Sequence, residues 1–200
     1  NEITLKQDSG STWNKVFNKG SAWSKFLNIV GVNTFKIETP NAVAIVRGTS
    51  FEVDKNEILV GSGSVEVTMS NNEKFILNEK KKLNWGNKET IQESFTNQDM
   101  EKIISRSKDT LQRMKFVRNQ EIQGQMDKMG LIKNRLMKKY NIKEQEIWSF
   151  VDSVDNGEYN VDELMQKLPI KTTPMEKIAG MTKEIQEQTK AIKEMKGEIY

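Results

Sequence analysis

The sequence predicts an α+β protein whose strands and helices are segregated along the chain. Residues 1–90 contain short stretches that alternate or are rich in β-branched and aromatic side chains, and Gly, Asn, Ser and Asp separate them. Residues 97–200 space their apolar side chains three or four positions apart and contain few glycines. The polar stretch 85–97 between them is typical of a linker. We therefore expect a β domain over residues 1–90 followed by a helical region.

The composition excludes several classes of chemistry. The 200 residues include no Cys and no His, which excludes disulfides, thiol nucleophiles, Ser-His-Asp triads and the usual zinc or haem ligands. The net charge is +3 and neither half is a basic block, so nucleic acid is not an expected partner. No apolar run reaches the roughly 18 residues of a membrane span, and no export signal is visible. We expect no cofactor.

The β half carries a weak repeat of three octads, residues 46–53, 60–67 and 76–83, each of which begins and ends on an aliphatic side chain. Stacked rungs of short strands joined by corners would produce this pattern, and so would an up-and-down meander. The expected β domain is therefore solenoid-like or sandwich-like. Gly48 can adopt backbone angles closed to other residues, so we expect a corner there, at which Arg47 bonds unpaired carbonyls or binds a ligand.

The run "FKIETPNAVAIVRGTSFEV", followed by "ILVGSGSVEV" and "KFILNEKKKL", resembles the FecR-type domain over roughly residues 3–86. The motif residues are Thr39, Pro40, Arg47, Gly48, Thr49 and Phe51. The resemblance implies a β-solenoid-like domain on the outer side of a cytoplasmic membrane. In its best-known setting this family relays a signal from an outer-membrane receptor to a sigma factor. The motif residues are structural in the family, so the resemblance implies no catalytic role.

The apolar spacing predicts helices near 97–118, 120–139, 142–154, 161–168 and 174–198. Glycines at 124 and 130 weaken the case for one unbroken helix over 97–140. The first two helices are therefore either an antiparallel hairpin or parts of a single long rod. Asn141, Asn160 and Thr173 each precede a Glu by three positions, a pattern that predicts the starts of the last three helices.

The stretch "DSVDNGEYNVDEL" suggests a calcium loop. With Gly157 as the sixth loop position, the ligand positions fall on Asp152, Asn156, Glu158 and Glu163. A simpler interpretation is a turn, in which Asn156 and Gly157 end one helix and Asn160 starts the next.

The last helix carries a heptad seam with one polar member. Its residues are Ile178, Met181, Ile185, Gln188, Ile192, Met195 and Ile199. A single helix with so narrow an apolar stripe cannot bury itself. The seam therefore docks on the preceding helices or forms a coiled coil with another chain, in which Gln188 would fix the register.

Together these features predict a non-enzymatic extracytoplasmic scaffold or protein-interaction module, periplasmic or at the cell surface. It would bind a protein partner or itself through the C-terminal helix. The alternative is a FecR-type regulatory sensor in transmembrane signalling to a sigma factor. An enzyme acting on carbohydrate would need two carboxylates facing one cleft. The candidates in the β half are Glu38, Glu52, Asp54 and Glu66, and alternation is expected to turn them to water.

Overall fold

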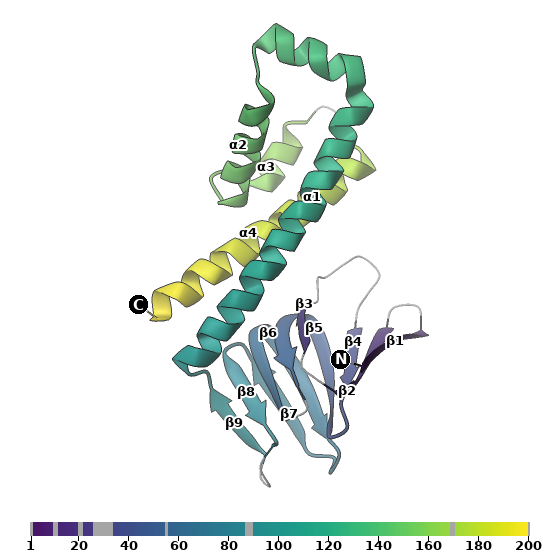
Figure 1. The fold of residues 1–200 in the computed structure, drawn as a ribbon, viewed down its shortest axis with the longest axis vertical. Helices are drawn as coiled ribbons and strands as arrows, with labels where there is room; N and C mark the ends of the chain where they lie inside the picture. The colour runs from purple at the N-terminus through teal and green to yellow at the C-terminus, as the bar shows by residue number, and fades with distance from the viewer. Residues whose placement is uncertain are drawn as a thin grey trace. The chain divides into compact units, whose positions relative to one another are not determined.

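The computed structural model describes residues 2–9, 12–19, 22–25, 34–54, 56–86, 90–168 and 171–199, with the side chains of 36–46, 50–54, 56–86, 90–168 and 171–197 among them. Strands occupy the first part of the chain and helices the second, which confirms the segregated α+β prediction (Figure 1). The chain divides into two compact units, and the boundary follows Arg106. This boundary lies inside the first helix rather than in the polar stretch 85–97.

The first unit contains one sheet, most of whose strands are antiparallel. The strands are β1 (Glu2–Ser9), β2 (Thr12–Lys19), β3 (Ala22–Lys25), β4 (Thr34–Glu38), β5 (Ala42–Val53), β6 (Glu57–Met69), β7 (Lys74–Asn78), β8 (Lys81–Asn84) and β9 (Ile91–Ser94). They pair in the order β1-β2-β4-β5-β6-β8-β9, with β3 on β5 and β7 on β6. Of these pairs, β2 and β4 run parallel.

The strand β9 corrects the expectation of a linker over 85–97. Its four residues pair with β8 in an antiparallel ladder. All four side chains are exposed, so the strand has no buried face to produce an apolar alternation. The strand is held by backbone hydrogen bonds to β8, and the pattern of side chains in the sequence does not reveal such bonds.

The corner expected at Gly48 falls within β5, one strand of the long β5–β6 hairpin. The chain continues as one strand through this position, and the pairing with β6 is irregular between Arg47 and Phe51. Opposite, Gly63 has a positive φ of 78°, a conformation that suits glycine and is common at bulges. The interruption is therefore a bulge within a strand rather than a corner between rungs. The side chains of Arg47, Gly48 and Thr49 lie outside the described part, so no role of Arg47 is tested.

The antiparallel pairing also corrects the solenoid-like alternative. A solenoid stacks rungs in parallel, whereas the described strands β4 to β9 join their neighbours as antiparallel pairs. The three octads are thus successive parts of a meander, and the sheet is not a closed barrel. Both halves of the β5–β6 hairpin contribute to one core.

Side chains of β4 to β8 form this core. Its buried members are Ile37, Ala42, Ala44, Val46, Phe51, Val53, Ile58, Val60, Val65, Val67, Met69, Leu77 and Leu83. Thr39 closes the turn that leads from β4 into β5, because its Oγ1 accepts from the Ala42 N–H and donates to the Ala42 carbonyl, both at 3.0 Å. Pro40 is exposed in that turn. Thr39 therefore shapes this turn, and Phe51 is fully buried in the core.

The first turns of helix α1 (Asn97–Tyr140) cover the opposite face of the β5–β6 hairpin. Ile103 is fully buried, and a Cβ added at Gly61 would lie 2.8 Å from its Cγ2. Glycine at this position therefore permits the close approach of helix and strand.

Glu52 lies on this covered face, which corrects the expectation that alternation turns it to water. It is 2% exposed and forms ion pairs with Lys102 at 3.2 Å and Arg106 at 3.9 Å, both from α1. The strand alternation was right, but a helix covers the side that we assigned to solvent. The other carboxylates considered there, on Glu38, Asp54 and Glu66, are half-buried or exposed.

A reciprocal cap fixes the start of α1. The Asp99 carboxylate accepts hydrogen bonds from the Thr96 N–H at 2.8 Å and from its hydroxyl at 2.7 Å, and the Asp99 N–H donates to the Thr96 Oγ1 at 3.2 Å. The ammonium of Lys82 on β8 donates to the same carboxylate at 3.0 Å. Burial alone would raise the pKa of Asp99, but these hydrogen bonds outweigh it and hold the pKa below its ordinary value. The same bond raises the pKa of Lys82.

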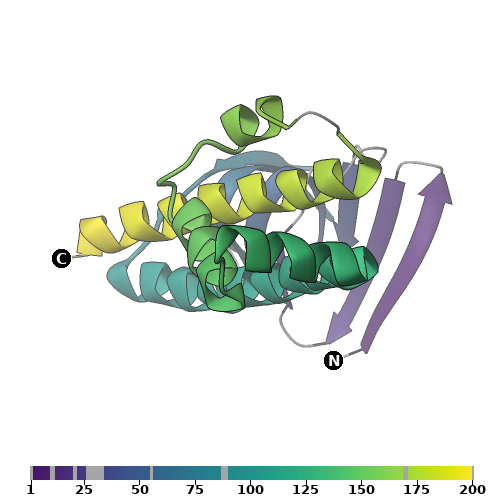
Figure 2. The ribbon, with the colours of Figure 1, turned by 90° about the horizontal axis from the view of Figure 1, so that it is seen from above.

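The second unit consists of α1 from Ser107 onward, α2 (Glu144–Asp155), α3 (Val161–Gln166) and α4 (Thr173–Ile199) as far as Glu198. The chain stays helical through residue 119, which corrects the break expected there between the helices 97–118 and 120–139. The break lies at Gly130, whose φ of 46° and ψ of −119° are not helical. Gly124 stays within the helix. Figure 2 shows α4 running alongside α1 within this unit.

One of the predicted helix starts needs a different assignment. Asn141 has a positive φ of 53° and ends α1, where the Ile142 N–H donates to the Met137 carbonyl at 2.9 Å. Lys143 precedes α2, and its N–H donates to the Glu146 carboxylate at 2.7 Å. Asn160 does cap α3, because its Oδ1 accepts from the backbone N–H groups of the second and third residues that follow.

We predict that Gly61→Val lowers the free energy of unfolding by about 2 kcal/mol, because the new methyls overpack the contact with Ile103. In an Ile103→Ala background the same change should cost about 1 kcal/mol less. Urea unfolding of the four chains of this double-mutant cycle, followed by circular dichroism, measures both values. Equal costs in the two backgrounds would contradict the contact.

We predict that Asp99→Asn reduces the acid sensitivity of the protein. The folded-state pKa of Asp99 is depressed, so the carboxylate stabilises the fold above its unfolded pKa of about 3.9. That contribution is lost as the pH falls through the depressed folded-state value. The difference in unfolding free energy between wild type and variant should therefore shrink between about pH 7 and about pH 2. A difference that stays constant over this range would contradict the assignment.

Candidate functional site

A buried arginine joins three helices of the second unit. Arg118 of α1 is 1% exposed, and its two terminal nitrogens donate to the two carboxylate oxygens of Asp155 at 2.8 Å each. It also donates to the hydroxyl of Thr182 on α4 at 3.1 Å and, through Nε, to the side chain of Asn119 at 2.8 Å. The planar fork of arginine suits this two-point recognition of a carboxylate. One side chain therefore fixes α2 and α4 against α1.

The position of Asp155 explains why it needs such a partner. It is the last residue of α2 and is fully buried. A negative charge is unfavourable at a helix C-terminus because the carbonyl dipoles there are negative. Arg118 offsets this charge, and the ammonium of Lys115 adds a contact of 3.2 Å to the Asp155 Oδ2. The carboxylate is stable in this place only with these cations beside it.

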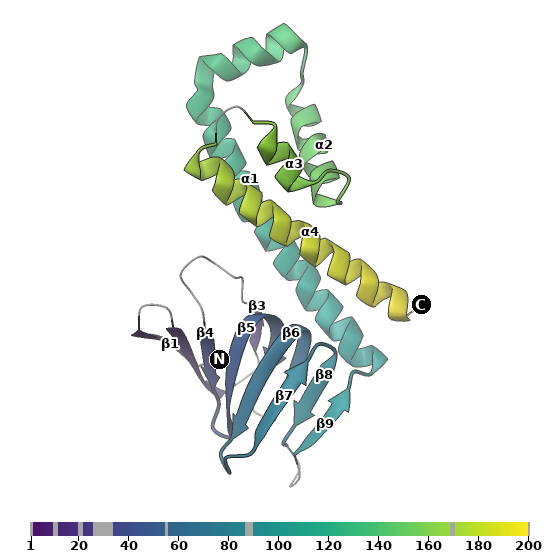
Figure 3. The same cartoon turned by 180° about the vertical axis from the view of Figure 1, so that it is seen from behind.

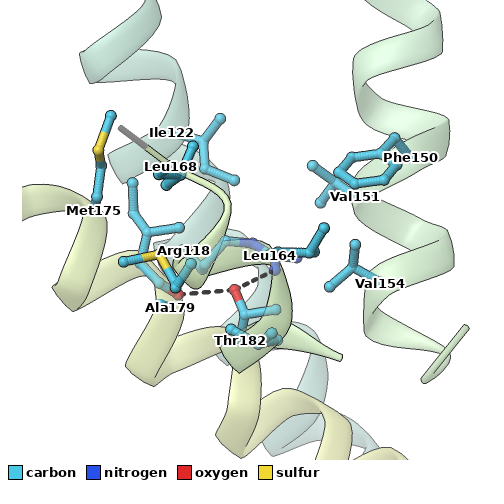
Figure 4. A pocket seen from close by; sticks show the side chains of 13 residues that line it. Arg118, Ile122, Phe150, Val151, Val154, Leu164, Leu168, Met175, Ala179 and Thr182 are labelled. Atoms are coloured by element: carbon cyan, nitrogen blue, oxygen red, sulfur yellow. Dashed lines mark hydrogen bonds between the residues drawn. The ribbon is translucent and has the colours of Figure 1, made fainter. Parts of the chain in front are cut away.

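Next to this bridge lies an open apolar groove with a volume of about 330 Å³, and Arg118 is part of its lining. Its lining comes from all four helices and the segment after α3: Arg118, Ile122, Phe150, Val151, Val154, Val161, Leu164, Met165, Leu168, Met175, Ile178, Ala179 and Thr182. Figure 4 shows Phe150, Val151 and Val154 of α2 on one side and Met175, Ala179 and Thr182 of α4 on the other. Phe150, Leu168 and Met175 remain more than a third exposed at the rim.

The groove offers little polar chemistry. Arg118 is bonded to Asp155, Asn119 and Thr182, and the Thr182 hydroxyl donates to the Ile178 carbonyl at 2.8 Å. The remaining lining side chains are apolar. Nearby, the amide of Gln186 on α4 donates to the Val154 carbonyl and to the Tyr159 carbonyl, the latter at 2.9 Å. These polar groups hold helices together, so the groove presents an apolar surface to any occupant.

The turn after α2 contains the calcium candidates and has the geometry of a helix end. Gly157 has a φ of 86°, its N–H donates to Val154, and the Glu158 N–H donates to Ser153. This pair of bonds is the Schellman motif that ends helices. Asp152 lies within α2, Asn156 follows its last residue, and Glu163 lies in α3. Among the described residues, no three acidic side chains come together as a metal site would need.

The heptad seam of α4 is largely covered within the chain. Ile185, Gln188, Ile192 and Met195 are buried, and Ile178 and Met181 are half-buried. The side chain of Ile199 lies outside the described part. Contacts of α4 with α1 include Arg118 to Thr182 and a 2.7 Å ion pair of Lys177 with Glu121. The docking alternative thus describes this seam, and a coiled coil through it would require α4 to leave these contacts.

The Arg118–Asp155 bridge and the groove were not anticipated from the sequence. One signal was present, because Arg118 lies four positions after Met114 and four before Ile122, on a stripe that is otherwise apolar. A cation on such a stripe needs a buried acid. Its partner is 37 positions away, and no local spacing identifies it.

Comparison with known proteins yields limited similarity. No family model matches the chain, and no curated protein matches it. Among solved structures, two crystal structures of a "putative anti-sigma factor" from Parabacteroides distasonis ATCC 8503 are similar to part of it. The first has 22% identity and a TM-score of 0.38, and the second 23% and 0.35. The matches cover 44% and 42% of this chain, and 44% and 41% of those chains. The chain therefore spans less than half the length of these structures.

We predict that Arg118→Leu lowers the free energy of unfolding by about 3 kcal/mol, because Asp155 stays buried with Lys115 as its remaining cation. The double variant Arg118→Leu/Asp155→Leu should lose less than the two single variants combined. Arg113→Leu is the matched control, since Arg113 is exposed on the same helix, and it should change stability by less than about 0.5 kcal/mol. Urea unfolding measures the free energy of unfolding of the two single variants, the double variant and the control. If the loss in the double variant equals the sum of the losses in the two single variants, the bridge is contradicted.

Proposed function

We propose that this chain is a non-enzymatic protein-interaction module whose helical unit binds an amphipathic helix of a partner protein. The groove of about 330 Å³ carries the proposal. Its apolar walls and open rim suit the apolar side chains that a helix presents at positions three and four apart. Two of the lining residues, Met165 and Met175, are unbranched and flexible, so they can adapt to such side chains.

A helix from a protein suits this groove better than a small polar molecule does. Small-molecule sites usually include a few polar groups that orient the ligand. Here Arg118 and Thr182 are the polar side chains of the lining, and both are engaged with neighbouring helices. An enzyme would also need polar groups that are free to react. The groove's chemistry therefore supports apolar recognition.

The proposal is tested by placing a photoreactive phenylalanine analogue at Met175, on the groove rim, in cells that produce the protein. The control position is Glu187, which is exposed elsewhere on α4. We expect an adduct from position 175 that is absent from position 187. The adduct protein is then purified and its binding measured by calorimetry. Ala179→Trp, which fills the groove, should weaken that binding about tenfold or more, and Glu187→Ala should not. Equal binding by wild type and Ala179→Trp would refute the groove as the site.

The resemblance to FecR-type domains supports two finer proposals. The first is an extracytoplasmic location, periplasmic or at the cell surface, and an inactive alkaline phosphatase fused behind the full gene product would contradict it. The second is the alternative role of a regulatory sensor that signals to a sigma factor. Deleting the gene should then change transcription from promoters that depend on such a factor. An unchanged transcript profile would leave the interaction module without a signalling role.

A further inference from the structure

The end of α1 carries an exposed apolar surface of its own, separate from the groove. Past the middle of the helix the apolar stripe is no longer covered, although the same stripe is buried at Met126. The exposed side chains are Met129 (43%), Leu131 (76%), Ile132 (61%), Leu136 (42%), Tyr140 (60%) and Ile142 (42%). Several exposed apolar side chains gathered on one short segment mark a candidate interaction surface.

The same segment is strongly basic. Residues 128–143 contain six cationic side chains and no Asp or Glu. They are Lys128, Lys133, Arg135, Lys138, Lys139 and Lys143. All but Lys133 are exposed. Lys133 is half-buried, and its Nζ lies 3.5 Å from the Oε2 of Glu144. This local charge exceeds the net charge of +3 of the entire chain. We call residues 128–143 the basic tip.

The basic tip is amphipathic in its helical part. Ile132, Leu136 and Tyr140 recur at four-residue steps, so they share one face of the helix. Arg135 and Lys139 flank this face, and Lys138 lies on the opposite side. The non-helical backbone at Gly130 separates this segment from the earlier part of α1. Figures 1 and 3 show the helix turning there, so that the segment runs across the end of the helical unit.

We propose that the basic tip binds the surface of an anionic phospholipid bilayer, with its apolar face inserted among the acyl chains and its cations on the phosphates. A short helix with aliphatic and aromatic side chains on one face and Lys and Arg on the other lies flat in such an interface. Long cationic side chains reach to the phosphate level while their stems stay apolar. Tyr140 suits the headgroup region, because its ring is apolar and its hydroxyl polar.

The shape of the surface favours lipid over an acidic protein helix. The exposed side chains belong to one projecting segment of a single helix and its following turn. Recognition of a partner helix in a groove needs concave walls, whereas a bilayer receives a projecting element and supplies many phosphates at once. In the described residues, no helix has the length and apolar content to cross a membrane. The contact proposed here is peripheral, and it does not depend on the groove or its partner.

The test uses the full chain and sedimentation with two kinds of vesicle, one of phosphatidylcholine and one of phosphatidylcholine mixed equally with phosphatidylglycerol. We expect binding to the mixed vesicles that falls with added salt, and little binding to phosphatidylcholine alone. Arg135→Gln/Lys138→Gln/Lys139→Gln should weaken it by about a hundredfold. Ile132→Ser/Leu136→Ser should weaken it about tenfold or more. The changed side chains are exposed, and circular dichroism verifies folding.

The matched control is Lys190→Gln/Lys193→Gln/Lys196→Gln, which removes the same charge from exposed positions on α4. It should bind the mixed vesicles as wild type does. If both triple variants lose binding to the mixed vesicles equally, the binding is a general electrostatic effect and the proposal is overturned. Absence of wild-type binding to the mixed vesicles would also overturn it. A photoadduct from position 136 to an acidic protein, without vesicle binding, would assign the basic tip to a protein partner instead.

Discussion

The helical unit depends on one buried charge pair. Arg118 and Asp155 bond through two nitrogen–oxygen contacts of 2.8 Å, with both side chains almost completely withdrawn from water. Each group alone would be costly in that place, so the pair requires α1 and α2 to be correctly aligned. Thr182 extends the requirement to α4. Arg118 and Thr182 also line the apolar groove, so the same contacts that align the helices form part of its wall.

The chain presents two surfaces of different chemistry within this unit. The groove is concave and apolar, with its polar groups used internally. The basic tip projects and combines cations with apolar side chains. The two surfaces suit different partners. An apolar groove receives the apolar side chains of a partner helix, whereas a basic amphipathic helix suits an extended anionic surface.

Much of the fold could be predicted from local patterns, for reasons that particular residues illustrate. The alternation around Phe51 and the short polar side chain at Asn160 act within a few positions of themselves, so the sequence reveals a strand and a helix start. The strand β9 was missed because it is exposed on both faces. Glu52 was misplaced because the helix that covers it lies about fifty positions later in the chain. The groove was missed for the same reason, since Arg118 and Asp155 meet only in three dimensions. The stripe over Ile132 and Leu136 was visible, but periodicity does not show whether a stripe is covered.

The burial of Asp155 has a consequence for how the helical unit comes apart. Its carboxylate sits at the negative end of α2, and the cations that neutralise it belong to α1. If α1 withdraws, the last turn of α2 keeps a repulsive charge and loses its compensation, so it tends to unwind. Helices separated by a long stretch of chain are therefore linked into one cooperative transition, and partial openings of this unit are disfavoured.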